Sequence, residues 1–488
     1  RSTLFPYTTL FRSTNLALDA KILKTFPSVD ETAVDALLQA EIAKNQKKIV
    51  VLDDDPTGVQ TVHDISVYTN WTKPAIEQAF AESNNLFYIL TNSRGFTAEQ
   101  TTAAHEEIAA AVDSVAKSTG KDYLYISRSD STLRGHYPLE TILLKKAYEA
   151  NTGRTIDGEV MCPFFKEGGR FTIDDVHYVQ DGDQLIPAAE TEFAKDKTFG
   201  YTKSDIKEYI EEKTQGAFKA AHVISISLDD LRACRYDAIE AQLMSVSDFN
   251  KIVMNAIDYC DVKVFCVALF RAMAKGKNFM FRSAAALVKV MGGVSDQPLL
   301  TRKDMVVQET TNGGVIVVGS HTEKTTKQVE YLRGHPAIDF VELDATLVKD
   351  DAAFTKEVNR CLAAEEAIIQ SGRTACVFTT RQLITADTGD KEDDLRLAVK
   401  ISDAVQSLVG RLSVVPSFVI AKGGITSSDV GTKALAVQRA NVLGQIEPGI
   451  PVWQTGDESK FPLTPYVIFP GNVGGIETLR DAAEKLMA

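Results

Sequence analysis

The stretch that decides the fold of the first half of the chain is Lys48–Leu52 (KIVVL), which runs directly into Asp53-Asp54-Asp55-Pro56-Thr57-Gly58. An apolar run bounded by a turn signal predicts a buried strand, and the carboxylates after it predict a loop at the carboxyl edge of a parallel sheet. One Asp at this place would be explained as a helix cap. Three in a row favour a site that holds a metal or takes a proton from a hydroxyl.

A second stretch of the same kind stands near the end of the chain, where Phe418–Ala421 (FVIA) precedes Lys422-Gly423-Gly424-Ile425-Thr426-Ser427-Ser428. Consecutive glycines at the start of a helix expose backbone N–H groups, which bind anions such as phosphate. Neither the P-loop pattern nor the G-x-G-x-x-G dinucleotide pattern occurs in the sequence. The two stretches together indicate phosphoryl transfer to a small hydroxylated acceptor.

Apolar runs alternate with helical stretches along the whole chain, which is typical of βα units and parallel sheets. In the first half, a capping box of Thr97 and Gln100 predicts a helix that ends near Gly120. Residues 181–215 are expected to form loops and a helix over the sheet. The predicted strands of this half are 48–52, 86–91, 122–127, 158–162, 221–227 and 263–269.

Between Met291 and Gly314 the composition shifts to Gly, Asp, Gln, Pro and charged residues, which predicts a domain boundary. We expect an α/β protein with two domains, 48–305 and 306–488, each with a mainly parallel sheet flanked by helices, and an active site in the cleft between them. In the second half the predicted strands are 315–319, 338–343, 375–379, 417–421, 441–446 and 465–469, and the predicted helices are 351–371, 392–410 and those that begin at Thr322, Ser427 and Ile476.

The beginning of the chain is set apart from both domains. Residues 1–13 (RSTLFPYTTLFRS) resemble the translation of a sequencing adapter and lack the apolar core of a signal peptide, so we exclude them from the fold as an artefact. The native chain is expected to begin shortly before Leu16. Residues 14–47 are expected to form a helical lead-in to the first domain.

The composition is that of a globular protein, with 44% hydrophobic and 24% charged residues. A formal net charge of −13 argues against nucleic acid as a partner. No run of about 18 apolar residues predicts a membrane span. The six cysteines show no C-x-x-C spacing, so we expect reduced thiols in a cytoplasmic protein rather than a disulfide frame or a zinc site.

Hydroxyl and charged residues alternate after the third predicted strand, in residues 127–136 (SRSDSTLRGH). Such a cluster could grip a polyhydroxy acid, with Arg128 on its carboxylate, Ser129 and Ser131 on its hydroxyls, and Asp130 near the alcohol that reacts. Ordinary capped turns use the same residue types. The place after a parallel strand favours a site.

Three more arginines belong to the loops at the same expected sheet edge. Arg94 offers a planar fork for a carboxylate, although a surface salt bridge would also explain it. Arg134 ends the hydroxyl-rich cluster. Arg170 follows two glycines in the loop after the fourth predicted strand, and we include it among the candidate substrate contacts.

Two further loops of the second half could meet a phosphate. Ser320 lies between the predicted strand 315–319 and the helix that begins at Thr322, where a serine is also the common helix cap. Gly471, Asn472 and Gly474 repeat the glycine-rich pattern before the last predicted helix.

These motifs, taken in order, resemble those of the four-carbon acid sugar kinase family, whose members have an N-terminal sugar-binding and a C-terminal nucleotide-binding domain. The resemblance covers the chain from about Lys48 to its end. It rests on D-D-x-T-G at Asp54–Gly58, D-S-T-L-R-G at Asp130–Gly135, G-G-R at Gly168–Arg170, G-S at Gly319–Ser320, G-G-x-T-S at Gly423–Ser427, I-E-P-G at Ile446–Gly449 and G-N-x-G at Gly471–Gly474.

The resemblance implies ATP-dependent phosphorylation of the terminal hydroxyl of a four-carbon sugar acid such as threonate, erythronate or 3-oxo-tetronate, with Mg²⁺ on the phosphates. The resemblance leaves open whether the protein is a homodimer. The expected catalytic residues are Asp55 and Asp130; the expected substrate contacts are Asp54, Arg94, Arg128, Ser129, Ser131, Arg134 and Arg170; the expected ATP contacts are Ser320, Gly423, Gly424, Ile425, Thr426, Gly471, Asn472 and Gly474.

Either Asp55 or Asp130 would accept the proton of the alcohol, and the sequence does not choose between them. Two other classes of protein stay open. A sugar-acid dehydratase or aldolase would also need Asp and Arg around a polyol, but it would not need glycine-rich helix openings in a separate domain. A sensor of nucleotides or sugar acids would keep the two pockets and lose the base.

Overall fold

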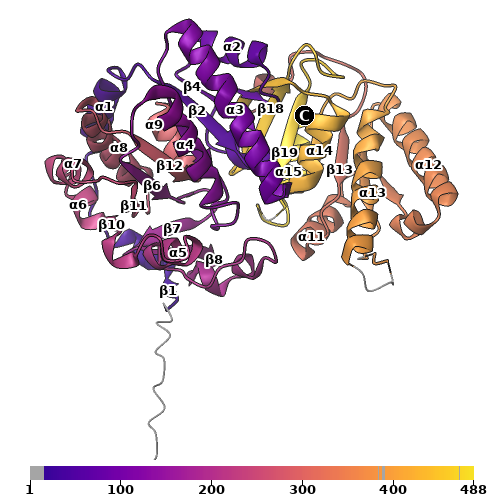
Figure 1. Ribbon diagram of the computed structural model, residues 1–488. Helices are drawn as coiled ribbons and strands as arrows, with labels where there is room; N and C mark the ends of the chain where they lie inside the picture. The colour runs from indigo at the N-terminus through magenta and orange to yellow at the C-terminus, as the bar shows by residue number, and fades with distance from the viewer. Residues whose placement is uncertain (1–15, 383, 387–390, 472, 488) are drawn as a thin grey trace, which may run out of the picture.

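Figure 1 shows a computed structural model of the chain, of which residues 16–382, 384–386, 391–471 and 473–487 are described here. The N-terminal half (indigo to magenta) and the C-terminal half (orange to yellow) lie side by side, and each has strands flanked by helices. The predicted fold class, two α/β domains with mainly parallel sheets, is confirmed. The two sheets are joined edge to edge into one sheet of 15 strands.

The N-terminal half contributes eight parallel strands to this sheet. Parallel strands are covered on both faces, and their apolar runs are continuous for that reason. The order of these strands across the sheet is β10 (Ile224–Ile226), β11 (Asn250–Met254), β6 (Gly158–Cys162), β12 (Phe279–Ser283), β5 (Tyr123–Arg128), β2 (Lys48–Asp53), β4 (Leu86–Leu90) and β3 (Ile65–Tyr68).

Alternate side chains of β2 show how the two faces are covered. Val50 and Leu52 belong to the apolar cluster built with α2, α3 and α4, whereas Ile49 and Val51 belong to the cluster built with α1, α8 and α9. The helices of this half are α1 (Glu31–Ile42), α2 (Lys73–Ala81), α3 (Ala98–Thr119), α4 (Leu139–Thr152), α5 (Ile206–Lys213), α6 (Leu228–Arg232), α7 (Tyr236–Met244), α8 (Tyr259–Ala274) and α9 (Ala285–Met291).

The C-terminal half begins after the short helix α10 (Arg302–Met305) and repeats this plan. Its strands, from the seam outward, are β17 (Arg439–Glu447), β18 (Ile450–Thr455), β19 (Pro465–Phe469), β16 (Val419–Lys422), β13 (Val315–Val318), β15 (Thr374–Thr379) and β14 (Ile338–Leu343). Its helices are α11 (Glu323–Leu332), α12 (Asp351–Gln370), α13 (Lys391–Gly410), α14 (Gly424–Asp429), which continues into a π-helical turn (Val430–Ala434), and α15 (Thr478–Met487).

The two halves meet where β3 pairs antiparallel with β17, with Val67 opposite Ala440. Two more antiparallel pairings follow, β17 with β18 and β18 with β19, so the parallel strands of the second half run opposite to those of the first. A flat sheet would place the two sets of carboxyl ends on opposite edges. They line the same cavity because the sheet twists, and β17 carries two register irregularities of the kind that increase twist.

A small antiparallel sheet lies beside the N-terminal half, in the order β1 (Leu18–Asp19), β9 (Gln184–Pro187), β8 (Val176–Asp181) and β7 (Arg170–Ile173). The sequence predicted only loops and a helix over 181–215. The predicted lead-in, residues 14–47, contains β1 and α1. Helix α1 packs on α8, and β1 pairs with β9. Short 3₁₀ turns cover Ala20–Lys24, Pro56–Val59, Ser93–Gly95, Ala188–Glu190, Glu192–Lys195, Ala220–His222 and Ala345–Lys349.

The predicted strand at 263–269 is wrong, because these residues lie inside α8. Val264 and Leu269 are buried, as are most residues on every side of this helix, since it is enclosed by the sheet, α1 and α7. An apolar run of this length does not show whether it is a buried strand or a buried helix. In the large sheet the prediction missed β3, β11 and β12 of the first half and β18 of the second, and it missed all four strands of the small antiparallel sheet.

All six cysteines are free thiols. Among the helices of the described residues, none combines the length and the apolar composition needed to cross a membrane.

Candidate active site

A cavity of about 550 Å³ lies between the two halves, lined by loops that follow β2, β4, β5 and β6 on one side and β13, β16 and β19 on the other. The walls approach each other at Gly424, where a Cβ atom would lie 3.3 Å from Oδ2 of Asp55. Of the candidate residues from the sequence, the cavity is lined by Asp55, Arg94, Arg128, Asp130, Ser131, Arg134, Arg170, Ser320, Gly423, Gly424, Ile425, Thr426 and Gly471.

The other candidates lie elsewhere. Asp54 and Ser129 are each 2% exposed and lie behind the lining. Gly474 lines an adjoining cavity. Asn472 lies outside the described residues.

The loop after β2 divides its three carboxylates among different partners. Asp55 turns toward the cavity and caps the short helix that follows, accepting a hydrogen bond of 2.8 Å from the N–H of Thr57. Asp53 turns back under the loop, and a Cβ atom at Gly58 would lie 1.8 Å from its Oδ2. Glycine at position 58 is therefore required by the carboxylate beneath it.

Arg94 holds the other two aspartates together. Its Nη2 and Nε contact Asp54 at 2.6 and 3.2 Å, and its Nη1 contacts Oδ2 of Asp55 at 3.2 Å. Burial raises the pKa of Asp54 above the ordinary value although Arg94 opposes the rise. Burial acts the same way on Asp55, but Arg94 and the hydrogen bonds from Thr57 outweigh it, and the pKa of Asp55 is lowered. Asp55 is therefore an anion at neutral pH.

Arg128 lies deeper and is almost fully buried. Its Nη1 is 3.3 Å from Oδ1 of Asp53, and its Nη2 donates to Gln60 at 3.4 Å. Burial raises the pKa of Asp53 to about 7 in spite of this arginine. The guanidinium expected on the substrate carboxylate thus already has a carboxylate partner in the protein.

Asp130 stands on the same wall and is held by its own loop. Nε of Arg134 donates to its Oδ2 at 2.7 Å, and the hydroxyl of Thr132 donates to the same oxygen. Burial alone would raise the pKa of Asp130, but Arg134 and Arg94 lower it far below the ordinary value. Asp130 is permanently charged under physiological conditions.

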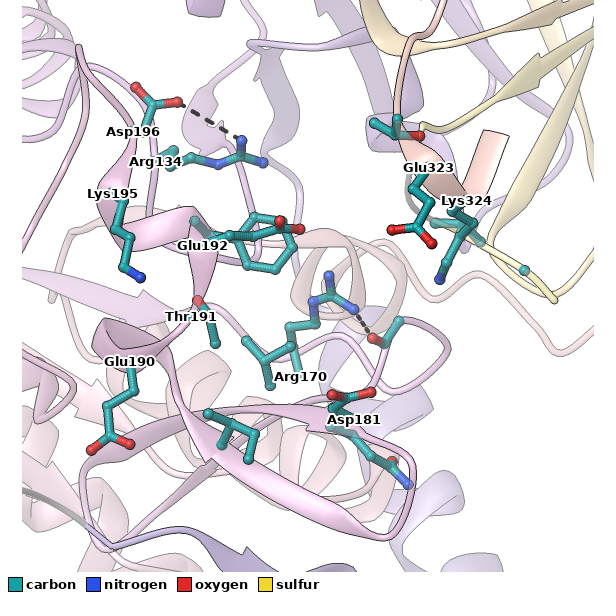
Figure 2. A pocket seen from close by; sticks show the side chains of 18 of the residues that line it. Arg134, Arg170, Asp181, Glu190, Thr191, Glu192, Lys195, Asp196, Glu323 and Lys324 are labelled. Atoms are coloured by element: carbon teal, nitrogen blue, oxygen red, sulfur yellow. Dashed lines mark hydrogen bonds and ion pairs between the residues drawn. The ribbon is translucent and has the colours of Figure 1, made fainter. Parts of the chain in front are cut away.

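The adjoining cavity, of about 1080 Å³, opens between the small antiparallel sheet and the start of α11 (Figure 2). Arg134, Arg170 and Phe193 line both cavities. The ring of Phe193 lies 5.0 Å from the guanidinium carbon of Arg134 and 5.6 Å from that of Arg170. One aromatic side chain therefore supports two cations where the cavities join.

The opposite wall is made mainly of small residues and backbone. Ser320 follows β13, and its Oγ accepts a hydrogen bond of 3.0 Å from Thr325. Gly423 has a φ of +120°, a conformation that L side chains rarely adopt, and it turns the chain from β16 into α14. A wall of this kind exposes main-chain N–H groups and suits an anion.

Lys422 connects the loops of this wall and was not singled out from the sequence. Its carbonyl accepts hydrogen bonds from the N–H groups of Gly319 and Ser320, each at 3.4 Å. Its ammonium group donates to the carbonyls of Pro470 at 2.6 Å and Gly471 at 3.2 Å. Burial and, to a smaller extent, the charge of Lys324 lower its pKa to about 7. The sequence feature that could have identified Lys422 is the position of a lysine at the end of an otherwise apolar strand.

Other lining residues were also missed. Gln60, Phe165, Phe193, His321, Thr322, Pro470 and Val473 complete the cavity. Phe193 comes from the segment predicted only as loops and a helix, so nothing in the sequence connected it with the arginines. Within the described ranges, no group of three or more His, Cys, Asp or Glu side chains is arranged to hold a metal.

Comparison with known proteins agrees with this two-walled site. A family model described as a sugar-binding N-terminal domain matches residues 49–291, and one described as a nucleotide-binding C-terminal domain matches residues 315–479. The fold and site thus define a protein that binds a sugar-type ligand on one domain and a nucleotide on the other. Since the two matches cover most of the sequence in this order, the chain belongs to the four-carbon acid sugar kinase family.

Two solved structures share the fold. The Haemophilus influenzae protein HI1011, of family DUF1537, is 17% identical with a TM-score of 0.58, and the match covers 90% of this chain and 100% of that chain. A Salmonella typhimurium LT2 protein described as "putative tRNA synthase" is 15% identical with a TM-score of 0.63, covering 89% of this chain and 98% of that chain. A search of curated proteins found no match. At these identities the likeness shows the fold alone.

Proposed function

We propose that this protein is an ATP-dependent kinase that phosphorylates the terminal hydroxyl of a four-carbon sugar acid, of the threonate, erythronate or 3-oxo-tetronate type, to the 4-phosphate. The observation that supports this most is the approach of Asp55 to Gly424 across one cavity. An anionic carboxylate on the sugar-binding domain faces a glycine loop on the nucleotide-binding domain. Phosphoryl transfer needs an acceptor and a phosphate to be aligned in this way.

Asp55 is the carboxylate that we assign to the proton of the acceptor alcohol. Arg134 and Thr132 both donate to Oδ2 of Asp130, which holds that carboxylate within its own loop, whereas Oδ2 of Asp55 contacts Arg94 and lies toward the glycine loop. As the alcohol oxygen bonds to the γ-phosphorus, the bond from that phosphorus to the bridging oxygen of ADP breaks, and the alcohol proton passes to Asp55. Asp130 would keep Arg134 and Arg94 in place beside the substrate.

The residues of the nucleotide side fit a triphosphate. Ser320 offers a hydroxyl, and Gly424, the first residue of α14, lines the cavity without a side chain of its own, whereas the N–H of Gly423 already donates to the carbonyl of Phe469 at 2.9 Å. Bound ATP supplies the phosphoryl group, and the N–H groups of this loop would hold its phosphates. Mg²⁺ in kinase sites is bound largely through the substrate phosphates, so bound ATP would bring most of the ligands of the ion.

Acid-dependent release of ADP, measured in a coupled assay over a panel of four-carbon acids, tests this function. We expect turnover with at least one acid, and a phosphomonoester on its terminal carbon by ³¹P NMR. ADP release that is the same with and without every acid contradicts the proposal. Loss of an acid without ADP formation would instead identify a dehydratase or aldolase, and binding without turnover would identify a sensor.

A further inference from the structure

Four arginines line the cavity, and three of them have a carboxyl group of the protein in direct contact. Arg94 is paired with Asp54 and Asp55, Arg128 with Asp53, and Arg134 with Asp130. Each of these three guanidinium groups therefore already has a carboxyl group of the protein in contact.

Arg170, the fourth arginine, has no carboxylate partner among the described residues. Its Nη1 donates to the carbonyl of Gly168 in its own loop, and its Nε is buried without a hydrogen-bond partner. Burial lowers the pKa of Arg170, because the cation loses water and gains no counter-charge in direct contact. Arg170 is half-buried, so it bears part of the cost of a desolvated cation, and a bound anion would relieve that cost.

The position of Arg170 gives the direction in which such an anion would bind. Arg170 begins β7 and lies at the junction of the two cavities, with Phe193 behind its guanidinium. Figure 2 shows the side chain of Arg170 extending toward the side of the cavity where Glu323 and Lys324 lie. Asp130 acts electrostatically on both Arg170 and Arg94, and Arg94 in turn contacts Asp55. Asp130 therefore lies within electrostatic range of both arginines, and Arg170 and Asp55 line the same cavity.

We propose that Arg170, rather than Arg128, binds the carboxylate of the acceptor acid. The acid then lies with its carboxylate toward the small antiparallel sheet and its terminal hydroxyl toward Asp55 and the glycine loop. This inference rests on the proposed kinase function and adds the orientation of the substrate and the group that distinguishes an acid from a neutral polyol. Phe193 would act as a positioning residue, since it fixes the plane of the guanidinium.

The test compares threonate with threitol, a neutral polyol of the same length, in the full chain. Arg170→Met is expected to lower kcat/KM for threonate by about 100-fold, mainly through KM, because a charge-assisted contact is lost. Its kcat/KM for threitol should stay near the wild-type value, so the preference for the acid disappears. Arg170→Lys should restore part of that preference. The KM for ATP should not change in either variant.

Lys197→Met serves as the matched control, because Lys197 is an exposed cation on the rim of the adjoining cavity and contacts none of these arginines. It should leave the kinetics with both acceptors unchanged. Circular dichroism shows whether each variant is folded.

Several results would overturn the inference. If Arg170→Met keeps the preference for threonate while Arg128→Met loses it, Arg128 is the anchor. If Arg170→Met raises the KM for ATP instead, the guanidinium belongs to the nucleotide site. Should the wild type release no ADP with any acid, the kinase function fails by itself, and equilibrium dialysis of threonate still tests the anchor. Equal binding to wild type and Arg170→Met would then exclude it.

Discussion

Asp53, Asp54 and Asp55 are neighbours in the sequence, yet each has a different electrostatic role. Asp53 contacts Arg128 and has a pKa raised to about 7, Asp54 forms a bidentate pair with Arg94, and Asp55 faces the cavity with a lowered pKa. The difference comes from the strand ending at Asp53, after which the chain turns and aims successive side chains in different directions. Only one of the three is placed for chemistry on a ligand.

Asp55→Asn is expected to lower kcat by about 100-fold or more, because the amide cannot accept the alcohol proton. Asp130→Asn should act mainly on the KM for the acid, since it frees Arg134 from its partner. Steady-state kinetics with a four-carbon acid and ATP would separate the two effects. Turnover of Asp55→Asn within a few-fold of wild type would exclude it as the base.

The pKa of Asp53 gives a prediction about stability. Between the ordinary pKa of about 4 and the folded pKa of about 7, the folded state holds a proton that the unfolded state has lost, so this residue makes stability fall as pH rises through that window. Asp53→Asn should remove this contribution, which is about 1.4 kcal/mol for each unit of pKa shift. Chemical denaturation at pH 5 and pH 8 measures it. An unchanged difference in unfolding free energy between the two pH values would contradict it.

At this scale the sequence predicted which residues gather but not how they pair. Arg128 is the last residue of β5 and Arg170 is the first residue of β7, and both were candidates. What distinguishes them is that Asp53 lies under Gly58 and reaches Arg128, whereas Gly168 offers Arg170 only a carbonyl. Such pairing depends on side-chain directions that a linear pattern does not contain.

Among the elements, the loop between β16 and α14 depends most on one buried group. The ammonium of Lys422 fixes the 470–471 segment, and its carbonyl fixes the 319–320 segment, so three loops of the nucleotide wall share one residue. Its pKa of about 7 results first from burial and then from Lys324. An anion bound nearby would favour the charged form of this lysine.

Lys422→Met should raise the KM for ATP about tenfold at pH 7, because hydrogen bonds from a charged group are lost, and leave the KM for the acid unchanged. In the wild type, the KM for ATP should increase from pH 7 to pH 9 as Lys422 loses its proton. The variant should not show that increase. If the variant follows the same pH profile as the wild type, Lys422 is not the titrating group.

Elements with explicit end signals were predicted well, and fully buried ones were not. The capping box of Thr97 and Gln100 and the left-handed Gly120 bound α3 as expected. By contrast, α8 has apolar residues on all sides, so its helical period is hidden by its environment. Local end signals decided the first case, and tertiary packing, which the sequence shows only indirectly, decided the second.

For the whole molecule, the main departure from expectation is that two predicted sheets form one. The pairing of Ile65–Tyr68 with Arg439–Glu447 joins segments that are far apart in the sequence. Arg439 adds an ion pair with Glu82 at 2.9 Å and a hydrogen bond to Ser66 at 2.9 Å across the seam. No local sequence pattern predicts a contact between two segments that are so far apart in the chain.

The continuous sheet predicts that both halves unfold together. The chain has two tryptophans, Trp71 in the first half and Trp453 in the second, so Trp71→Phe and Trp453→Phe each leave one fluorescent reporter. We expect the two reporters to give midpoints within about 2 °C of each other. Asn441→Pro, which places proline within β17, should separate them. Two well-separated transitions in the otherwise unaltered chain would contradict the prediction.

The seam also limits how the protein can open. Main-chain hydrogen bonds between β3 and β17 join one half to the other, so the halves are not connected by a flexible linker alone. A wide opening of the cavity by rotation of the halves would have to break these hydrogen bonds. Exchange of nucleotide and product must then rely on movements smaller than a domain rotation, made by the loops at the rim while the ladder stays intact. In the proposed kinase, the reacting groups on the two halves would keep their relative positions between turnovers. Movements of the loops at the opening of the cavity would then set the slow step of the catalytic cycle.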